Sequence, residues 1–158
     1  MTFRSSDRKT GRATSIWSAE VAYLLDANVV SELRKPKPNV NVLTWYEGQR
    51  RAEAFISTLV VGEIRQGIER VRARDTVQAD ALERWLTGLV TAYRGRVLPI
   101  TVDVADAWGR MNASPAPLPA IDGLMAATAK VHRLTLVTRN VTDVARAGVP
   151  VVNPFEPR

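Results

Sequence analysis

Short apolar runs alternate along the chain with longer segments that carry one apolar face. The run Val21–Leu25 is the clearest of them, and it ends at a single acid, Asp26. Runs of this length, bounded by polar residues, are typical of buried parallel strands. We therefore predict strands here and in four further short segments, at 52–57, 96–100, 134–138 and 149–152.

Helical periodicity fills most of the intervals between these runs. Val60, Ile64 and Ile68 recur at a spacing of four, which is the apolar stripe of a helix. Thr58 is the expected N-cap of this helix, which ends near Arg72. Further helices are expected at 29–35, 40–51, 75–94, from 101 onward and at 120–131. The alternation predicts an α/β domain with a mainly parallel sheet.

Composition narrows the class of protein. With 158 residues, of which 46% are hydrophobic and 24% charged, the chain fits one soluble domain. No apolar run approaches the ~20 residues of a membrane span, so no membrane association is expected. The lack of cysteine excludes disulfides and thiolate metal sites. It is compatible with a reducing cytoplasm, where we expect the protein to act.

Charge and histidine content limit the possible chemistry. A net charge of +6 and a pI near 10.3 favour a polyanionic partner. The single histidine excludes a nuclease that uses two imidazoles, and also a histidine-rich metal site. Any hydrolysis would therefore rest on carboxylates, hydroxyls, lysine or arginine.

The first 20 residues differ in character from the rest of the chain. Residues 1–20 are polar and mostly basic, with no apolar core that would make them a secretory signal. We expect a disordered or non-native extension here, and a domain at 21–158. The alternative is a basic arm that binds RNA or DNA.

Four acids occupy comparable places in the predicted fold: Asp26 after the first strand, Glu63 early in a helix, Asp122 at the start of a buried helix and Asp143 after the fourth strand. Strand ends and helix starts of a parallel sheet meet at one edge. Converging carboxylates repel each other unless a cation compensates them, and Mg²⁺ or Mn²⁺ prefers such oxygen ligands. The alternative reading makes Asp26 and Asp122 helix caps and Glu63 a solvated side chain.

Four segments carry a family resemblance: YLLDANVVSEL at 23–33, ISTLVVGEIRQGI at 56–68, AIDGLMAATAKVHRLTLVTRNVTDV at 120–144 and VPVVNPF at 149–155. In these segments the chain resembles the PIN-domain family, in particular the VapC and FitB-type toxins of toxin–antitoxin pairs. The resemblance implies a three-layer α/β/α fold with a five-stranded sheet, homodimer formation and Mg²⁺- or Mn²⁺-dependent endoribonuclease activity on RNA. It also implies a cognate protein antitoxin that holds the toxin inactive.

The resemblance assigns acids to the site. Asp26, Glu63 and Asp122 match the three family acids that are expected to hold the metal and to act in catalysis. The fourth catalytic position is open between Asp143 and Asn140, the latter contributing through its side-chain oxygen.

Other residues are expected to support this site. Asn28 belongs to the matching motif, and Thr138 is expected to orient a carboxylate through a hydrogen bond. Ala27 stands where many relatives have threonine, which removes one hydroxyl from the edge of the site. Arg65 and Arg139 are the candidates for contact with the RNA backbone.

Two other functions remain as alternatives. One is a catalytically silent PIN-like module that binds nucleic acid or regulates. The other is a phosphatase with Asp26 as nucleophile, but such enzymes usually have a second aspartate where this chain has Asn28. The presence of all three matching acids favours the metal-dependent ribonuclease.

Overall fold

A parallel five-stranded sheet forms the centre of the computed structural model, which describes residues 21–49 and 53–158. The expected extension at 1–20 lies outside the described residues. The strand order is β3-β2-β1-β4-β5, and every neighbouring pair is parallel. The strands are β1 (Ala22–Leu25), β2 (Glu53–Ser57), β3 (Val97–Leu98), β4 (Thr135–Val137) and β5 (Val151–Val152). The predicted α/β fold with a parallel sheet is confirmed.

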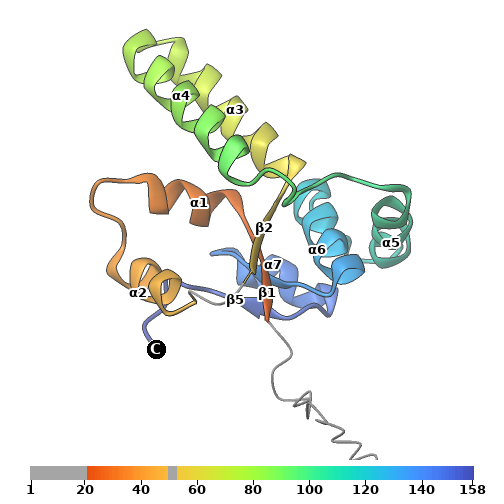
Figure 1. Ribbon diagram of the computed structural model, residues 1–158. Coiled ribbons are helices and arrows are strands. Elements are labelled where there is room, and N and C mark those ends of the chain that lie inside the picture. The colour runs from red at the N-terminus through yellow and green to blue at the C-terminus, as the bar shows by residue number, and fades with distance from the viewer. Residues whose placement is uncertain (1–20, 50–52) are drawn as a thin grey trace, which may run out of the picture.

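Helices connect successive strands and cover the sheet. In Figure 1, α1 and α2 lie on one side of the strands and α5 and α6 on the other, while α3 and α4 extend away as a pair. In 21–49 and 53–158 no helix has the length and apolar content needed to cross a bilayer. The helices are α1 (Ala27–Arg34), α2 (Val40–Gly48), α3 (Thr58–Arg72), α4 (Thr76–Ala92), α5 (Val102–Asn112), α6 (Ala120–His132) and α7 (Val141–Val144), followed by a short 3₁₀ helix, η1 (Ala145–Ala147).

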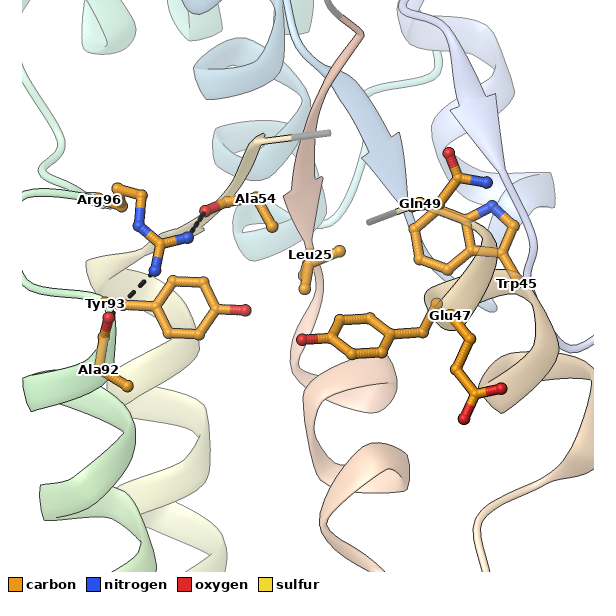
Figure 2. Close-up of a pocket in the computed structure, with 9 residues that line it drawn as sticks. Leu25, Trp45, Glu47, Gln49, Ala54, Ala92, Tyr93 and Arg96 are labelled. Atoms are coloured by element: carbon orange, nitrogen blue, oxygen red, sulfur yellow. Dashed lines mark hydrogen bonds between the residues drawn. The ribbon is translucent and has the colours of Figure 1, made fainter. Parts of the chain in front are cut away.

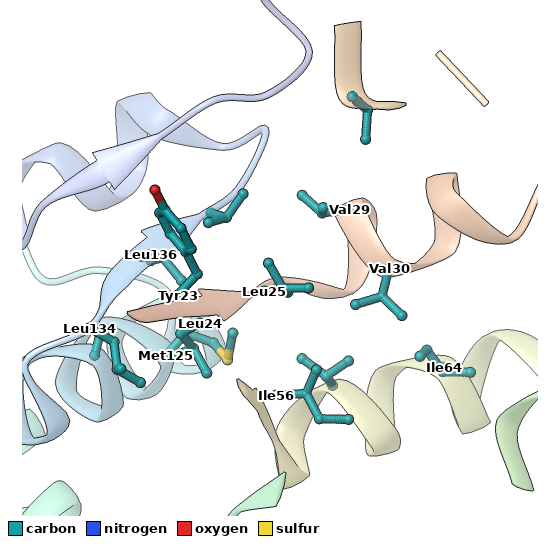
Figure 3. Close-up of a cluster of buried hydrophobic side chains, with 14 of the residues drawn as sticks. Tyr23, Leu24, Leu25, Val29, Val30, Ile56, Ile64, Met125, Leu134 and Leu136 are labelled. Carbon is teal, nitrogen blue, oxygen red and sulfur yellow. The ribbon is translucent and has the colours of Figure 1, made fainter. Parts of the chain in front are cut away.

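The core accounts for the position of β1 in the middle of the sheet. Successive strand residues point to opposite faces, yet Leu24 and Leu25 are both buried, so both faces of β1 are covered. They belong to one cluster with Val29 of α1 and Met125 of α6, which Figure 3 shows around the strand. The middle of α6 is buried, as its apolar sequence predicts, whereas both ends of the helix are exposed.

The N-cap of α3 differs from the prediction. Ser57, not Thr58, caps this helix, and its hydroxyl oxygen accepts a hydrogen bond from the Leu59 N–H at 3.1 Å. Ser57 ends β2 with an extended backbone, so the strand passes into the helix without an intervening residue. Thr58 is the first helical residue and its side chain is exposed. The tight junction fixes where α3, and with it Glu63, leaves the sheet.

Candidate active site

Asp26 lies at the carboxyl end of β1, and each of its carboxylate oxygens accepts a short hydrogen bond. One carboxylate oxygen, Oδ1, accepts from the Ala27 N–H at 2.7 Å and caps α1. The other, Oδ2, accepts from the Thr138 hydroxyl at 2.7 Å. Thr138 follows β4, and the register pairs Leu25 with Val137, so residues 26 and 138 come next to each other at adjacent strand ends. The sheet thus joins two side chains 112 positions apart.

Asn28 links the two strand ends further. Its amide nitrogen lies 3.4 Å from both Asp26 Oδ2 and the Thr138 hydroxyl oxygen. Its oxygen accepts from the Arg139 N–H at 3.3 Å, and the Asn140 N–H donates to the Thr138 hydroxyl at 3.1 Å. The buried Thr138 hydroxyl is therefore the centre of a small polar network. That network fixes the orientation of the Asp26 carboxylate.

Asp122 enters the same region from the first turn of α6. The N-cap of α6 is Pro119, and no side chain caps the helix, so the capping alternative for Asp122 is not what the structure has. One oxygen of Asp122 accepts from the Asn140 side-chain amide at 3.2 Å. Burial raises the pKa of Asp122, and the negative charges of Asp26 and Asp143 raise it further.

Glu63 faces these aspartates from α3. Its side chain is half-buried, and burial is the main cause that raises its pKa above the usual value. The charges of Asp26 and Asp122 add to this rise. Since repulsion between charges weakens with distance, the effect of Asp26 and Asp122 on Glu63 indicates that the three side chains lie around a common space at this edge of the sheet. The alternative of a fully solvated Glu63 is therefore not what the structure has.

The carboxylates border this space without closing it. In the part of the chain that the structure describes, no three acidic or imidazole side chains come close enough to enclose an ion as they stand. The donor set nevertheless consists of carboxylate and amide oxygens, and neighbouring negative charges add to the rise that burial causes in the pKa values of Glu63 and Asp122. This chemistry fits a hard divalent cation.

The two candidates for the fourth position both lie beside Asp122. Asn140 contacts it directly, whereas Asp143, in the first turn of α7, acts on it through charge. Both are half-buried.

The two arginines proposed for RNA contact differ in their surroundings. Arg65 forms ion pairs with Glu83 at 2.6 Å and Glu69 at 3.4 Å, so its charge is already compensated. Arg139 is exposed, and its guanidinium carbon lies 4.4 Å from the ring centroid of Phe155. Phe155 was not identified from the sequence as a residue near the site. The only signal for it was the aromatic residue in the NPF segment that follows the last strand.

One hollow adjoins the acids, and a second hollow lies apart from them. One, of about 240 Å³, adjoins Glu63 between α1, α3 and α4. The other, of about 510 Å³, lies between α2 and the end of α4, where Arg96 donates to the Ala54 carbonyl at 2.8 Å and to the Ala92 carbonyl at 3.0 Å (Figure 2). None of the four acids lines this second hollow, so it is separate from the candidate site.

Fold and site together define the class: an α/β domain whose parallel strands and adjoining helices bring carboxylates to one edge of the sheet. The chain belongs to the PIN domain family, whose profile matches residues 23–148.

This chain aligns with two bacterial relatives over nearly their full length. The chain is 34% identical to the VapC ribonuclease Y4jK of Sinorhizobium fredii, over 85% of this chain and 98% of that protein. It is 32% identical to the toxin FitB of Neisseria gonorrhoeae, over 84% and 97%. The crystal structure of FitAcB from the same organism superposes with a TM-score of 0.78 at 31% identity, covering 85% of this chain and 99% of that one.

Proposed function

We propose that this chain is a metal-dependent endoribonuclease and the toxin of a toxin–antitoxin pair. The observation that carries the proposal is the Asp26 carboxylate, held by Thr138 at the sheet edge and close enough to Glu63 for its charge to add to the rise that burial causes in the pKa of that glutamate. Membership of the PIN domain family and the similarity to a VapC ribonuclease and to the toxin FitB support the same function.

Asp26, Glu63 and Asp122 are the proposed ligands of Mg²⁺ or Mn²⁺. Such an ion, when bound, supplies positive charge that compensates the carboxylates, makes a water more acidic and stabilises a departing oxygen. Thr138 keeps Asp26 aimed at the shared space, and the Asn140 amide does the same for Asp122. Asp143, or one of the three ligand acids, would orient the attacking water, and Asn140 would contribute to the fourth position through its side-chain oxygen.

The proposed partners follow from the same class. We propose an RNA substrate, a cognate protein antitoxin and a second copy of this chain in a homodimer, all in the cytoplasm. The similarity to FitB as found in FitAcB, and to FitAB bound to a DNA fragment at a TM-score of 0.78 and 29% identity, supports the antitoxin partner.

RNA cleavage by the purified protein, freed of antitoxin, tests this function. We expect structured RNA to be cut with Mn²⁺ and left intact with EDTA. Asp26→Asn should lower the rate by more than ~100-fold, because it removes a ligand, while the fold stays intact.

Asp103→Asn is the matched control, since Asp103 is an exposed acid in the first turn of α5 and lies outside the site. It should cleave like the wild type. RNA binding without metal-dependent cleavage would overturn the proposal in favour of a silent binding module.

A further inference from the structure

Arg139 is held between two residues that touch the acids. Thr138 precedes it and donates to Asp26, and Asn140 follows it and donates to Asp122. The Arg139 N–H donates to Asn28 Oδ1, so its backbone is part of the same polar network. The guanidinium, in contrast, is exposed. The backbone of Arg139 thus lies beside the carboxylates, while its side chain is exposed and extends to Phe155.

The ring of Phe155 forms a fixed platform under this guanidinium. The Phe155 carbonyl accepts from the Asn41 amide of α2 at 3.0 Å, and its N–H donates to Asn153 Oδ1 at 3.0 Å. Its side chain packs against the main hydrophobic core. The C-terminal segment is thereby tied to α2, and the ring lies 4.4 Å from the Arg139 guanidinium carbon.

The charge of Arg139 is available for a ligand. Within the described ranges, Arg139 has no carboxylate partner in an ion pair, whereas other arginines do: Arg65, Arg72 and Arg110. The pKa of Glu32 is lowered first by its hydrogen bond to Lys35, and the charge of Arg139 makes the smallest contribution. The Glu32 carboxylate is paired with Lys35 at 2.6 Å and accepts a hydrogen bond from the Asn39 N–H at 2.9 Å.

We propose that Phe155 is a positioning residue that holds Arg139 to bind a backbone phosphate of the RNA. The proposal rests on the ribonuclease function proposed above and assigns the platform that places the cation. Stacking on the ring occupies the face of the guanidinium and leaves the N–H donors around its rim free for phosphate oxygens. A guanidinium that is already ordered loses less entropy when the phosphate binds.

Steady-state cleavage of a labelled RNA oligonucleotide with Mn²⁺ tests this role through a double-mutant cycle. Arg139→Gln should raise KM roughly 10-fold and flatten the dependence of log(kcat/KM) on log[salt] by about 0.7, the slope of one phosphate contact on a single strand. Phe155→Leu should raise KM about 3-fold with little change in kcat, because it removes only the ring face. In the Arg139→Gln background, Phe155→Leu should have no further effect.

Two variants separate positioning from packing. Phe155→Tyr keeps the ring and should restore wild-type KM. Arg139→Lys keeps the positive charge but loses the planar stack on the ring, and should raise KM about 3-fold, as Phe155→Leu does. This second variant keeps the test valid should Phe155→Leu fold poorly.

Different results would overturn different claims. Additive effects of the two substitutions, or wild-type KM in Arg139→Lys, would overturn the positioning role while leaving the ribonuclease intact. A wild-type protein that shows no Mn²⁺-dependent cleavage would overturn the ribonuclease function itself, and the role of Phe155 with it.

Discussion

Asp26 uses its two carboxylate oxygens for different tasks. Oδ1 caps α1, and Oδ2 receives the hydroxyl of Thr138. A helix cap and a place in the active site are usually considered alternative roles for an aspartate. Asp26 can fill both roles, because α1 begins where β1 ends. The cap sets the rotamer, and the buried threonine prevents it from turning away.

Thr138→Val tests the importance of that hydroxyl. Valine keeps the shape but leaves Asp26 without its 2.7 Å donor and the Asn140 N–H without its acceptor. We expect metal-dependent cleavage to fall by ~10–100-fold and the free energy of unfolding by about 1–2 kcal/mol. Thr138→Ser, which keeps the hydroxyl, should stay close to wild type. Wild-type Mn²⁺ affinity in Thr138→Val would contradict the orienting role.

Glu63→Gln tests the cost of ionising Glu63 within the site through its pH dependence. The pKa of Glu63 is raised in the folded state, first by burial and then by Asp26 and Asp122, so ionising it destabilises the fold. This cost is absent below the unfolded pKa of about 4.3 and grows as the pH rises through the folded pKa. With EDTA, Glu63→Gln should therefore be more stable than wild type at pH 7 by less than about 1 kcal/mol, since the side chain is half-exposed.

Urea unfolding followed at pH 7 and near pH 4 measures this difference. The gain should disappear at the lower pH. A variant that is no more stable than wild type at pH 7 would show that ionising Glu63 carries no cost in the folded protein.

The start of α6 is built by contacts that bring Asp122 to the site. Asn112 holds both backbone groups of Leu118, accepting from its N–H at 3.0 Å and donating to its carbonyl at 3.2 Å, and so shapes the proline-rich loop before the helix. The indole of Trp108 packs against Gly123, where an added Cβ would lie 2.9 Å from Trp108 Nε1. Packing against Trp108 therefore explains why the residue after Asp122 is a glycine.

Gly123→Ala should destabilise the protein, in contrast to the usual effect of alanine in a helix. The methyl group would collide with Trp108, and we expect a loss of about 1–3 kcal/mol in the free energy of unfolding. The control is Gly88→Ala in α4, where nothing lies within 4 Å of the added carbon. It should stabilise by up to ~1 kcal/mol. Denaturant unfolding in which both variants behave alike would exclude the packing role.

At the scale of the whole sheet, local features of the fold could be predicted from the sequence, whereas contacts between distant strands could not. Strand and helix periodicity is local, so the α/β class and the positions of most elements could be predicted from the pattern. The pairing of β1 with β4 is a contact between distant segments, and it decides that Thr138 meets Asp26. The sequence motif suggested a threonine–carboxylate bond but not which carboxylate.

Other features could not be predicted because packing, and not periodicity, sets them. Ser57 caps α3 because β2 joins the helix directly, which no local pattern distinguishes from a cap at Thr58. The ion pair of Arg65 with Glu83 depends on how α3 packs against α4. The stack of Arg139 on Phe155 depends on where the chain passes after β5.

Mn²⁺ binding to the antitoxin-free protein, measured by titration calorimetry, is the most direct test that separated acids form one metal site. We expect saturable binding in the wild type and in Asp103→Asn, and its loss in both Asp26→Asn and Asp122→Asn. Wild-type binding by the two site variants, with their folds intact, would contradict a shared site.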